Sequence, residues 1–74
     1  MINASVIHKI VQLHSDISIT WVAEDGSIVK VPHCRCTSFH GEGDTLNILI
    51  PVSNQVRTVN RNTIIELNGE EVIL

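Results

Sequence analysis

The chain has 74 residues, of which 43% are hydrophobic and 18% are charged, and its formal net charge is −3. This composition is too apolar for a disordered chain, and the length allows one thin hydrophobic core but not two, so we expect residues 1–74 to form a single domain. The negative charge disfavours binding to long nucleic acids, which depends on cations that neutralise phosphates, but does not exclude it.

The first predicted element is a helix over residues 3–14. Its apolar residues recur at the spacing of one helix face, and they are Val6, Ile7, Ile10 and Val11. This spacing predicts that the face packs on a sheet. Asn3 or Ser5 is the candidate N-cap, because a short polar side chain can accept hydrogen bonds from the free amides of the first turn.

A β-hairpin is predicted over residues 17–31. Hydrophobicity alternates with period two in its first strand, as is typical of a half-buried strand, and the apolar side carries Ile17, Ile19, Trp21 and Ala23. Residues 24–27 form the predicted turn, in which Gly26 tolerates a positive φ. Residues 28–31 then resume the extended pattern.

The alternation changes phase at Pro32. Before this residue the apolar face carries Val29 and Val31. After it the less polar positions are Cys34 and Cys36, which are one residue out of phase. Proline donates no hydrogen bond to a strand ladder and is tolerated at irregularities, so we expect a bulge or a bend there.

The second half of the chain is predicted to contain short strands. A loop over residues 38–44 precedes a strand over residues 45–50, whose apolar face carries Leu46, Ile48 and Ile50. Further strands are predicted over residues 55–59, 63–67 and 70–74. The pair Asn68 and Gly69 is the strongest signal for a two-residue hairpin turn.

These elements predict a mainly β (α+β) fold with an N-terminal helix and five or six short antiparallel strands. One strand must be strongly bent, which fits a small, partly open barrel of the SH3-like kind or a curled sheet covered by the helix. No motif in the sequence identifies a family, and a fold alone does not imply a function.

Cys34, Cys36 and His40 are the candidate metal ligands, because zinc prefers thiolates and imidazoles. The spacing is not a standard one, and the fourth ligand would have to be His8 or His14. We therefore expect reduced, partly buried cysteines, with a zinc-binding module as the weaker alternative and no cofactor. A disulfide between the cysteines is not expected, because one residue in an extended strand separates them.

Other chemistry is sparse. The sequence contains no motif of a nucleophilic, metal-dependent or phosphate-binding enzyme, so we predict that the protein is not an enzyme. Arg35, Arg57 and Arg61 are the candidates for a nucleic-acid-binding barrel, which is the alternative function. Only Trp21 and Phe39 could stack on bases, and this disfavours that alternative.

Outward-pointing aliphatic residues favour a protein partner. If the alternating faces are assigned as above, Val22 and Leu49 point away from the core, as does one of the adjacent residues Ile64 and Ile65, for which we take Ile64. We therefore predict a non-catalytic interaction module that forms a homodimer. No segment is apolar and long enough to span a membrane, and the few cysteines indicate a cytoplasmic protein without a membrane partner.

Overall fold

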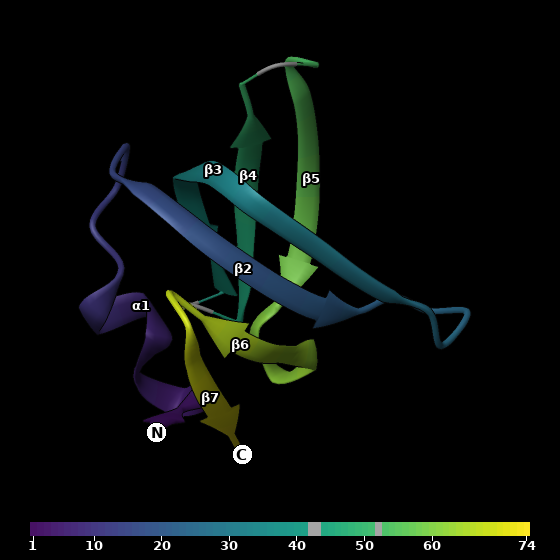
Figure 1. The fold of residues 1–74 in the computed structure, drawn as a ribbon. Coiled ribbons are helices and arrows are strands. Elements are labelled where there is room, and N and C mark those ends of the chain that lie inside the picture. Colours follow the sequence, from purple (N-terminus) through teal and green to yellow (C-terminus); the bar gives the residue numbers. More distant parts are fainter. Residues whose placement is uncertain (42–43, 52) are drawn as a thin grey trace.

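The computed structural model describes residues 1–41, 44–51 and 53–74. Within these ranges the chain forms a mainly β domain whose sheet is curled but not closed, as Figure 1 shows. The strands are β1 (Ile2–Asn3), β2 (Asp16–Val22), β3 (Ile28–His40), β4 (Thr45–Ile50), β5 (Gln55–Asn60), β6 (Ile64–Leu67) and β7 (Glu70–Ile73), in the order β1-β7-β6-β2-β3-β4-β5. The predicted fold class is confirmed. The sheet is nevertheless mixed, because β1 pairs with β7 in parallel.

The N-terminal helix is shorter than predicted. A 3₁₀ turn, η1 (Ala4–Val6), leads into α1 (Ile7–Ile10), and the chain is already extended at Val11. Asn3 is the N-cap, since its Oδ1 accepts hydrogen bonds from the backbone N of Ser5 at 2.9 Å and from its Oγ at 2.7 Å. Many residues here are β-branched, which lowers helix propensity.

The buried face of this segment also differs from the prediction. Ala4, Ile7 and Val11 are in the core, whereas Ile10 is 50% exposed. Ala4 and Ile7 are three residues apart and share one face of the helical segment, whereas Val11 is buried in the extended chain that follows it. Burial of Ala4 therefore turns Ile10 toward solvent.

The predicted hairpin of β2 and β3 is confirmed. Gly26 has a φ of +87° in the turn. Asp25 stabilises this turn, because its Oδ1 accepts hydrogen bonds from the backbone N of Ser27 at 2.9 Å and from its Oγ at 2.6 Å. These two bonds lower the pKa of the Asp25 carboxyl, because they favour the charged form.

A bulge lies at Pro32, as the change of phase predicted. Ile17 is opposite Cys34 and Ile19 is opposite Val31, so β3 contains one residue more than β2 between these pairs. Because of this extra residue, Val31 and Cys34 are both buried. β3 stays paired with β2 as far as Arg35 and pairs with β4 from Arg35 onward, so this one long strand joins the two halves of the curled sheet (Figure 1).

Two further bulges were not predicted. In β3, Cys36 is opposite Ile48 but Ser38 is opposite Asn47, which leaves Thr37 as an extra residue. The strand continues to His40, so the predicted loop over residues 38–44 begins later than expected, and its residues 42–43 lie outside the described ranges. The third bulge is in β6.

The bulge in β6 decides which isoleucine points outward. Thr20 is opposite Glu66 and Trp21 is opposite Ile64, which leaves Ile65 without a partner on β2. Ile64 is 2% exposed and Ile65 is 40% exposed. The prediction that Ile64 points outward is therefore wrong.

The turn between β6 and β7 has the predicted conformation. Asn68 and Gly69 have φ values of +51° and +82°, as a tight two-residue hairpin requires. Asn68 also ties the turn to β2, because its Oδ1 accepts a hydrogen bond from the backbone N of Ser18 at 3.1 Å and its own N donates to the O of Ser18 at 2.9 Å.

The core fills the concave side of the sheet and consists mainly of aliphatic side chains. The largest fully buried side chains belong to Ile7, Ile19, Leu46, Ile48, Leu67, Val59, Cys34 and Cys36. Among the described residues, no helix is both long and apolar enough to cross a membrane.

Candidate functional site

The candidate metal ligands lie on opposite faces of β3. Cys34 and Cys36 are fully buried in the core, whereas His40 is exposed and opposite Thr45. A regular strand would place all three on one face, but the extra residue at Thr37 reverses the phase before His40. Among the described residues, no group of three or more His, Cys, Asp or Glu side chains could hold a metal ion.

Both thiols are protonated groups of the core. Sγ of Cys34 lies 3.6 Å from the O of Ile17, and Sγ of Cys36 lies 3.5 Å from the O of Ser38. Burial raises the pKa of the Cys34 thiol to about 11, with smaller contributions from Asp16 and from Cys36. Burial also raises the pKa of the Cys36 thiol. The hydrogen bond to the backbone of Ser38 lowers this pKa and partly offsets the effect of burial. Such thiols are poor nucleophiles and poor metal ligands.

His40 belongs to a polar network on the outer face of the sheet. Its Nε2 lies 3.0 Å from Nδ2 of Asn47 and 3.3 Å from Oγ of Ser38. Oγ1 of Thr58 donates to Oδ1 of Asn47 at 2.8 Å and extends the network to β5. These bonds join β3, β4 and β5, and they give His40 a structural role.

The three candidate arginines do not form one basic patch. The register places Arg35 beside Leu49 and Val56 in one row across β3, β4 and β5. Arg57 lies in the next row, beside the buried residue Ile48, so Arg35 and Arg57 are on opposite faces.

Arg61 is engaged elsewhere. It begins the 3₁₀ turn η3 (Arg61–Thr63), and its Nη2 lies 3.2 Å from Oδ1 of Asp44. Its side chain is only 20% exposed. The structure therefore does not bring the three arginines together, as a nucleic-acid-binding surface would require.

Outward aliphatic residues occur on both halves of the sheet. Leu49 is half-buried beside Val56, which is 62% exposed, on the half formed by β3, β4 and β5. Val22 is half-buried on the other half, directly opposite Ile28. Val22 and Leu49 therefore belong to two separate surfaces.

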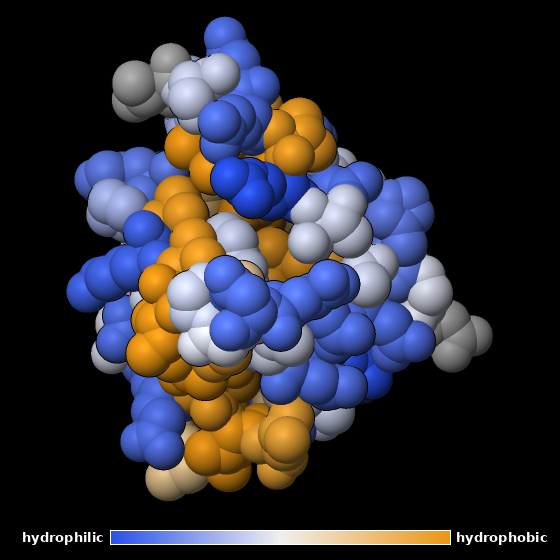
Figure 2. Space-filling model, turned by 90° about the vertical axis from the view of Figure 1, so that its right-hand side faces the viewer, coloured by the Kyte–Doolittle hydropathy of each residue, from blue (hydrophilic) through white to orange (hydrophobic). Residues whose placement is uncertain are grey.

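Val22 is part of a row that crosses four neighbouring strands. Ile28 is 68% exposed, and Ile65 and Ile73 are 40% and 39% exposed. Each lies at the level where β2 ends: Ile28 is opposite Val22, Ile65 is in the bulge next to Trp21, and Ile73 is two residues beyond Glu71. We call Ile28, Val22, Ile65 and Ile73 the apolar row. Figure 2 shows apolar side chains gathered in a band on this side of the molecule.

A second row, with charges at its ends, lies beside the apolar row. Lys30 on β3 is opposite Thr20 on β2, Thr20 is opposite Glu66 on β6, and Glu66 is opposite Glu71 on β7. We call these residues the polar row. Its cation is at one edge of the surface and its two carboxylates are at the other.

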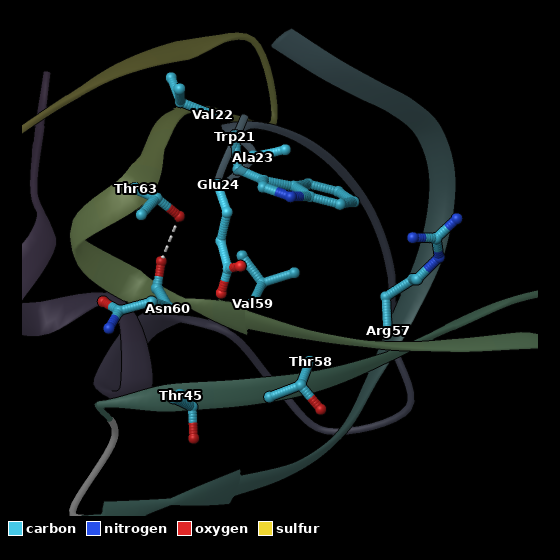
Figure 3. Close-up of a pocket in the computed structure, with 10 residues that line it drawn as sticks. All are labelled: Trp21, Val22, Ala23, Glu24, Thr45, Arg57, Thr58, Val59, Asn60 and Thr63. Atoms are coloured by element: carbon cyan, nitrogen blue, oxygen red, sulfur yellow. Dashed lines mark hydrogen bonds between the residues drawn. The ribbon is translucent and has the colours of Figure 1, made fainter. Parts of the chain in front are cut away.

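A cleft opens between the end of β2 and β5. Its volume is about 410 Å³, and its walls are Trp21, Val22, Ala23, Glu24, Thr45, Arg57, Thr58, Val59, Asn60 and Thr63. Trp21 and Val59 are buried and form its apolar base, while Glu24 and Arg57 are exposed. Figure 3 shows Glu24 and Arg57 at opposite ends of the group, with the indole of Trp21 between them.

Neither the apolar row nor the cleft was predicted from the sequence, for different reasons. The pairing of Val22 with Ile28 could have been found from the turn over residues 24–27, whose length sets the register. The outward position of Ile65 depends on a bulge that leaves no mark in the sequence. The cleft joins Trp21 to Arg57, and only the curl of the sheet brings these residues together.

Comparison of the chain with protein-family models, with curated proteins and with solved structures finds no match.

Proposed function

We propose that the chain is a non-catalytic interaction module that forms a homodimer through the apolar row. The observation that supports this proposal is the continuity of the row. Four neighbouring strands each present one outward aliphatic residue at the same level, and Ile28 is 68% exposed. Single exposed aliphatic residues are normal, whereas a contiguous row of them marks an interaction surface.

The charges of the polar row support a second copy of the chain as the proposed partner. Consider a two-fold axis parallel to the strands, between β2 and β6. Rotation about this axis places β3 of one copy over β7 of the other. It leaves the position of each residue along the strand direction unchanged. Ile28 then meets Ile73 of the partner subunit, and Lys30 meets Glu71 of the partner subunit. Each contact forms twice, so the order of apolar and charged residues on the face is complementary to itself.

The placement of the carboxylates supports the same arrangement. Glu66 and Glu71 are directly opposite each other, and like charges at such positions destabilise a sheet. Lys30 of the same chain is separated from Glu66 by Thr20. In the dimer, the lysine of the partner would offset the repulsion between the two carboxylates.

Sedimentation velocity at micromolar concentration tests the proposal, with a substitution in the row and a matched control. We expect the wild-type chain to sediment as a dimer and Ile28→Glu as a monomer with an unchanged circular dichroism spectrum, because the substitution buries a carboxylate in the interface. Val56→Glu is the control, since Val56 has a similar exposure of 62% but lies on the other half of the sheet. A monomeric wild-type chain, or equal effects of both substitutions, would contradict the proposal.

Two finer assignments accompany this function. We assign the curled sheet to the SH3-like kind of small barrel, because one bent strand, β3, belongs to both halves and η3 leads from β5 into β6. We also propose that the protein works in the cytoplasm, where its free cysteines stay reduced.

A further inference from the structure

We propose that the cleft between the end of β2 and β5 binds an extended peptide segment of another protein that carries an acidic side chain. This site is separate from the proposed dimer interface. The side chain of Trp21 points into the cleft, whereas the next residue, Val22, turns its side chain away from it (Figure 3). Successive residues of a strand point to opposite faces, so the cleft and the apolar row are on the two faces of β2.

Trp21 gives the first indication of a ligand. The residue is 7% exposed, and its indole Nε1 is not one of the buried side-chain atoms left without a partner among the described residues. The nitrogen edge of the ring faces the space between Glu24 and Val59, as Figure 3 shows. The indole N–H is therefore open to the cleft, where the carbonyl or carboxylate oxygen of a ligand can accept from it.

Arg57 gives the second indication. It lies on the inner face of β5, in the row of Ile48, and no carboxylate within the described ranges forms an ion pair with it. A guanidinium beside an apolar base binds a carboxylate more strongly than one in open solvent, because its planar donors match the two oxygens. Trp21 and Arg57 thus present donors at two places along the cleft: Arg57 suits an acidic side chain, and the indole N–H suits a carbonyl oxygen of the same peptide.

The shape of the cleft favours an extended peptide. Four consecutive residues of β5 line it, from Arg57 to Asn60, so the cleft follows the strand. Among the described residues, β5 is a terminal strand of the sheet and pairs only with β4. Its other edge therefore offers backbone donors and acceptors, which an extended peptide can pair with as an added strand. The volume of about 410 Å³ accommodates side chains of such a peptide.

Glu24 limits which peptides fit. Its carboxylate is exposed at the end of the cleft away from Arg57. It would repel a second acidic residue and accept from a hydroxyl, an amide or an amine. We therefore expect a single acidic residue placed at Arg57, rather than a run of acidic residues.

The experiment is an NMR titration that follows the indole N–H of Trp21, the only tryptophan in the chain. The probes are capped pentapeptides with threonine and valine in the flanking positions and with aspartate, glutamate, asparagine or lysine at the centre. We expect saturable shifts of the indole and of the β5 amides with the two acidic peptides. Binding of the asparagine and lysine peptides should be at least about tenfold weaker, because the charge-assisted bond to Arg57 is lost.

A pair of variants separates the cleft from general charge effects. Arg57→Gln should lose at least about tenfold in affinity for the aspartate peptide. Arg35→Gln removes the same charge from the opposite face of the sheet and should bind as the wild-type chain does. The spectra of both variants show directly whether the fold is retained. The titration is repeated on Ile28→Glu, so that failure of the dimer and failure of the cleft are distinguishable.

Several results would overturn the inference. One is the absence of any shift at peptide concentrations up to about 10 mM, the weak end of peptide recognition. Another is equal binding of the aspartate and asparagine peptides, or equal losses in the two arginine variants. Saturation by inorganic phosphate or by a short oligouridylate, without saturation by the acidic peptides, would instead assign the cleft to phosphate-bearing ligands.

Discussion

At the scale of single residues, the two cysteines show how burial sets chemistry. Both side chains are fully buried, and burial raises the pKa of the Cys34 thiol to about 11. The thiolate is the reactive form, and it is scarce below this pKa. Neither cysteine is therefore available for nucleophilic or metal-binding chemistry in the folded chain.

We predict that iodoacetamide at about pH 8 modifies neither cysteine in the native chain and modifies both in urea, because only unfolding exposes them and restores an ordinary thiol pKa. Mass spectrometry of the intact protein over time checks this. Rapid native modification would show that the thiols are accessible.

The same shift predicts how stability depends on pH. The folded pKa of Cys34 lies above its ordinary value of 9.0, so the unfolded chain loses its proton first as the pH rises. The contribution of the protonated Cys34 thiol to the stability of the fold is therefore complete below about pH 9 and is lost between about pH 9 and about pH 11. Between about pH 8 and about pH 10.5, the free energy of unfolding measured in urea should therefore fall less for Cys34→Ala than for the wild-type chain. An equal loss of unfolding free energy in both proteins would contradict the raised pKa of Cys34.

The two adjacent isoleucines provide a second test at this scale. Ile64→Ala should lower the free energy of unfolding by about 2–5 kcal/mol, because it leaves a cavity in the core. Ile65→Ala should lower it by less than about 1 kcal/mol, since its side chain is 40% exposed. Chemical denaturation of the two variants checks this, and the reverse order would place the bulge of β6 elsewhere.

At the scale of elements, turns were predictable and most bulges were not. The pair Asn68 and Gly69 requires positive φ values that few residues adopt, so the sequence marks this turn directly. The bulge at Pro32 also left a mark, because the apolar positions changed phase there. Thr37 is an extra residue among polar neighbours, and Ile64 and Ile65 are identical in chemistry, so neither of those bulges alters the pattern.

The turn between β6 and β7 allows a further prediction. Asn68→Gly keeps the positive φ but removes the hydrogen bond from the backbone N of Ser18 to Oδ1 of Asn68. We expect a loss of about 1 kcal/mol in the free energy of unfolding, measured by urea denaturation. Faster hydrogen exchange at the amide of Ser18 should accompany it. An unchanged exchange rate would mean that the side chain does not tie the turn to β2.

At the scale of the whole molecule, the sequence predicted a mainly β fold because the alternation of residues such as Ile17, Ile19 and Trp21 is a local signal. It did not predict the candidate surfaces, since these depend on long-range register. Leu49 and Val22 were both expected to point outward, but nothing in the sequence indicated that they belong to different halves of the sheet. The cleft depends on the curl of the sheet, which the bent strand β3 produces.

In the proposed two-fold interface, Lys30 meets Glu71 of the partner subunit, and mixing two charge-reversed variants tests this contact. Lys30→Glu and Glu71→Lys each place like charges at both contacts, so each variant alone should dimerise about tenfold more weakly than the wild-type chain. In an equimolar mixture the two variants should form a heterodimer with opposite charges at both contacts. Sedimentation velocity should show dimer restored in the mixture. A mixture as monomeric as its components would contradict the claim.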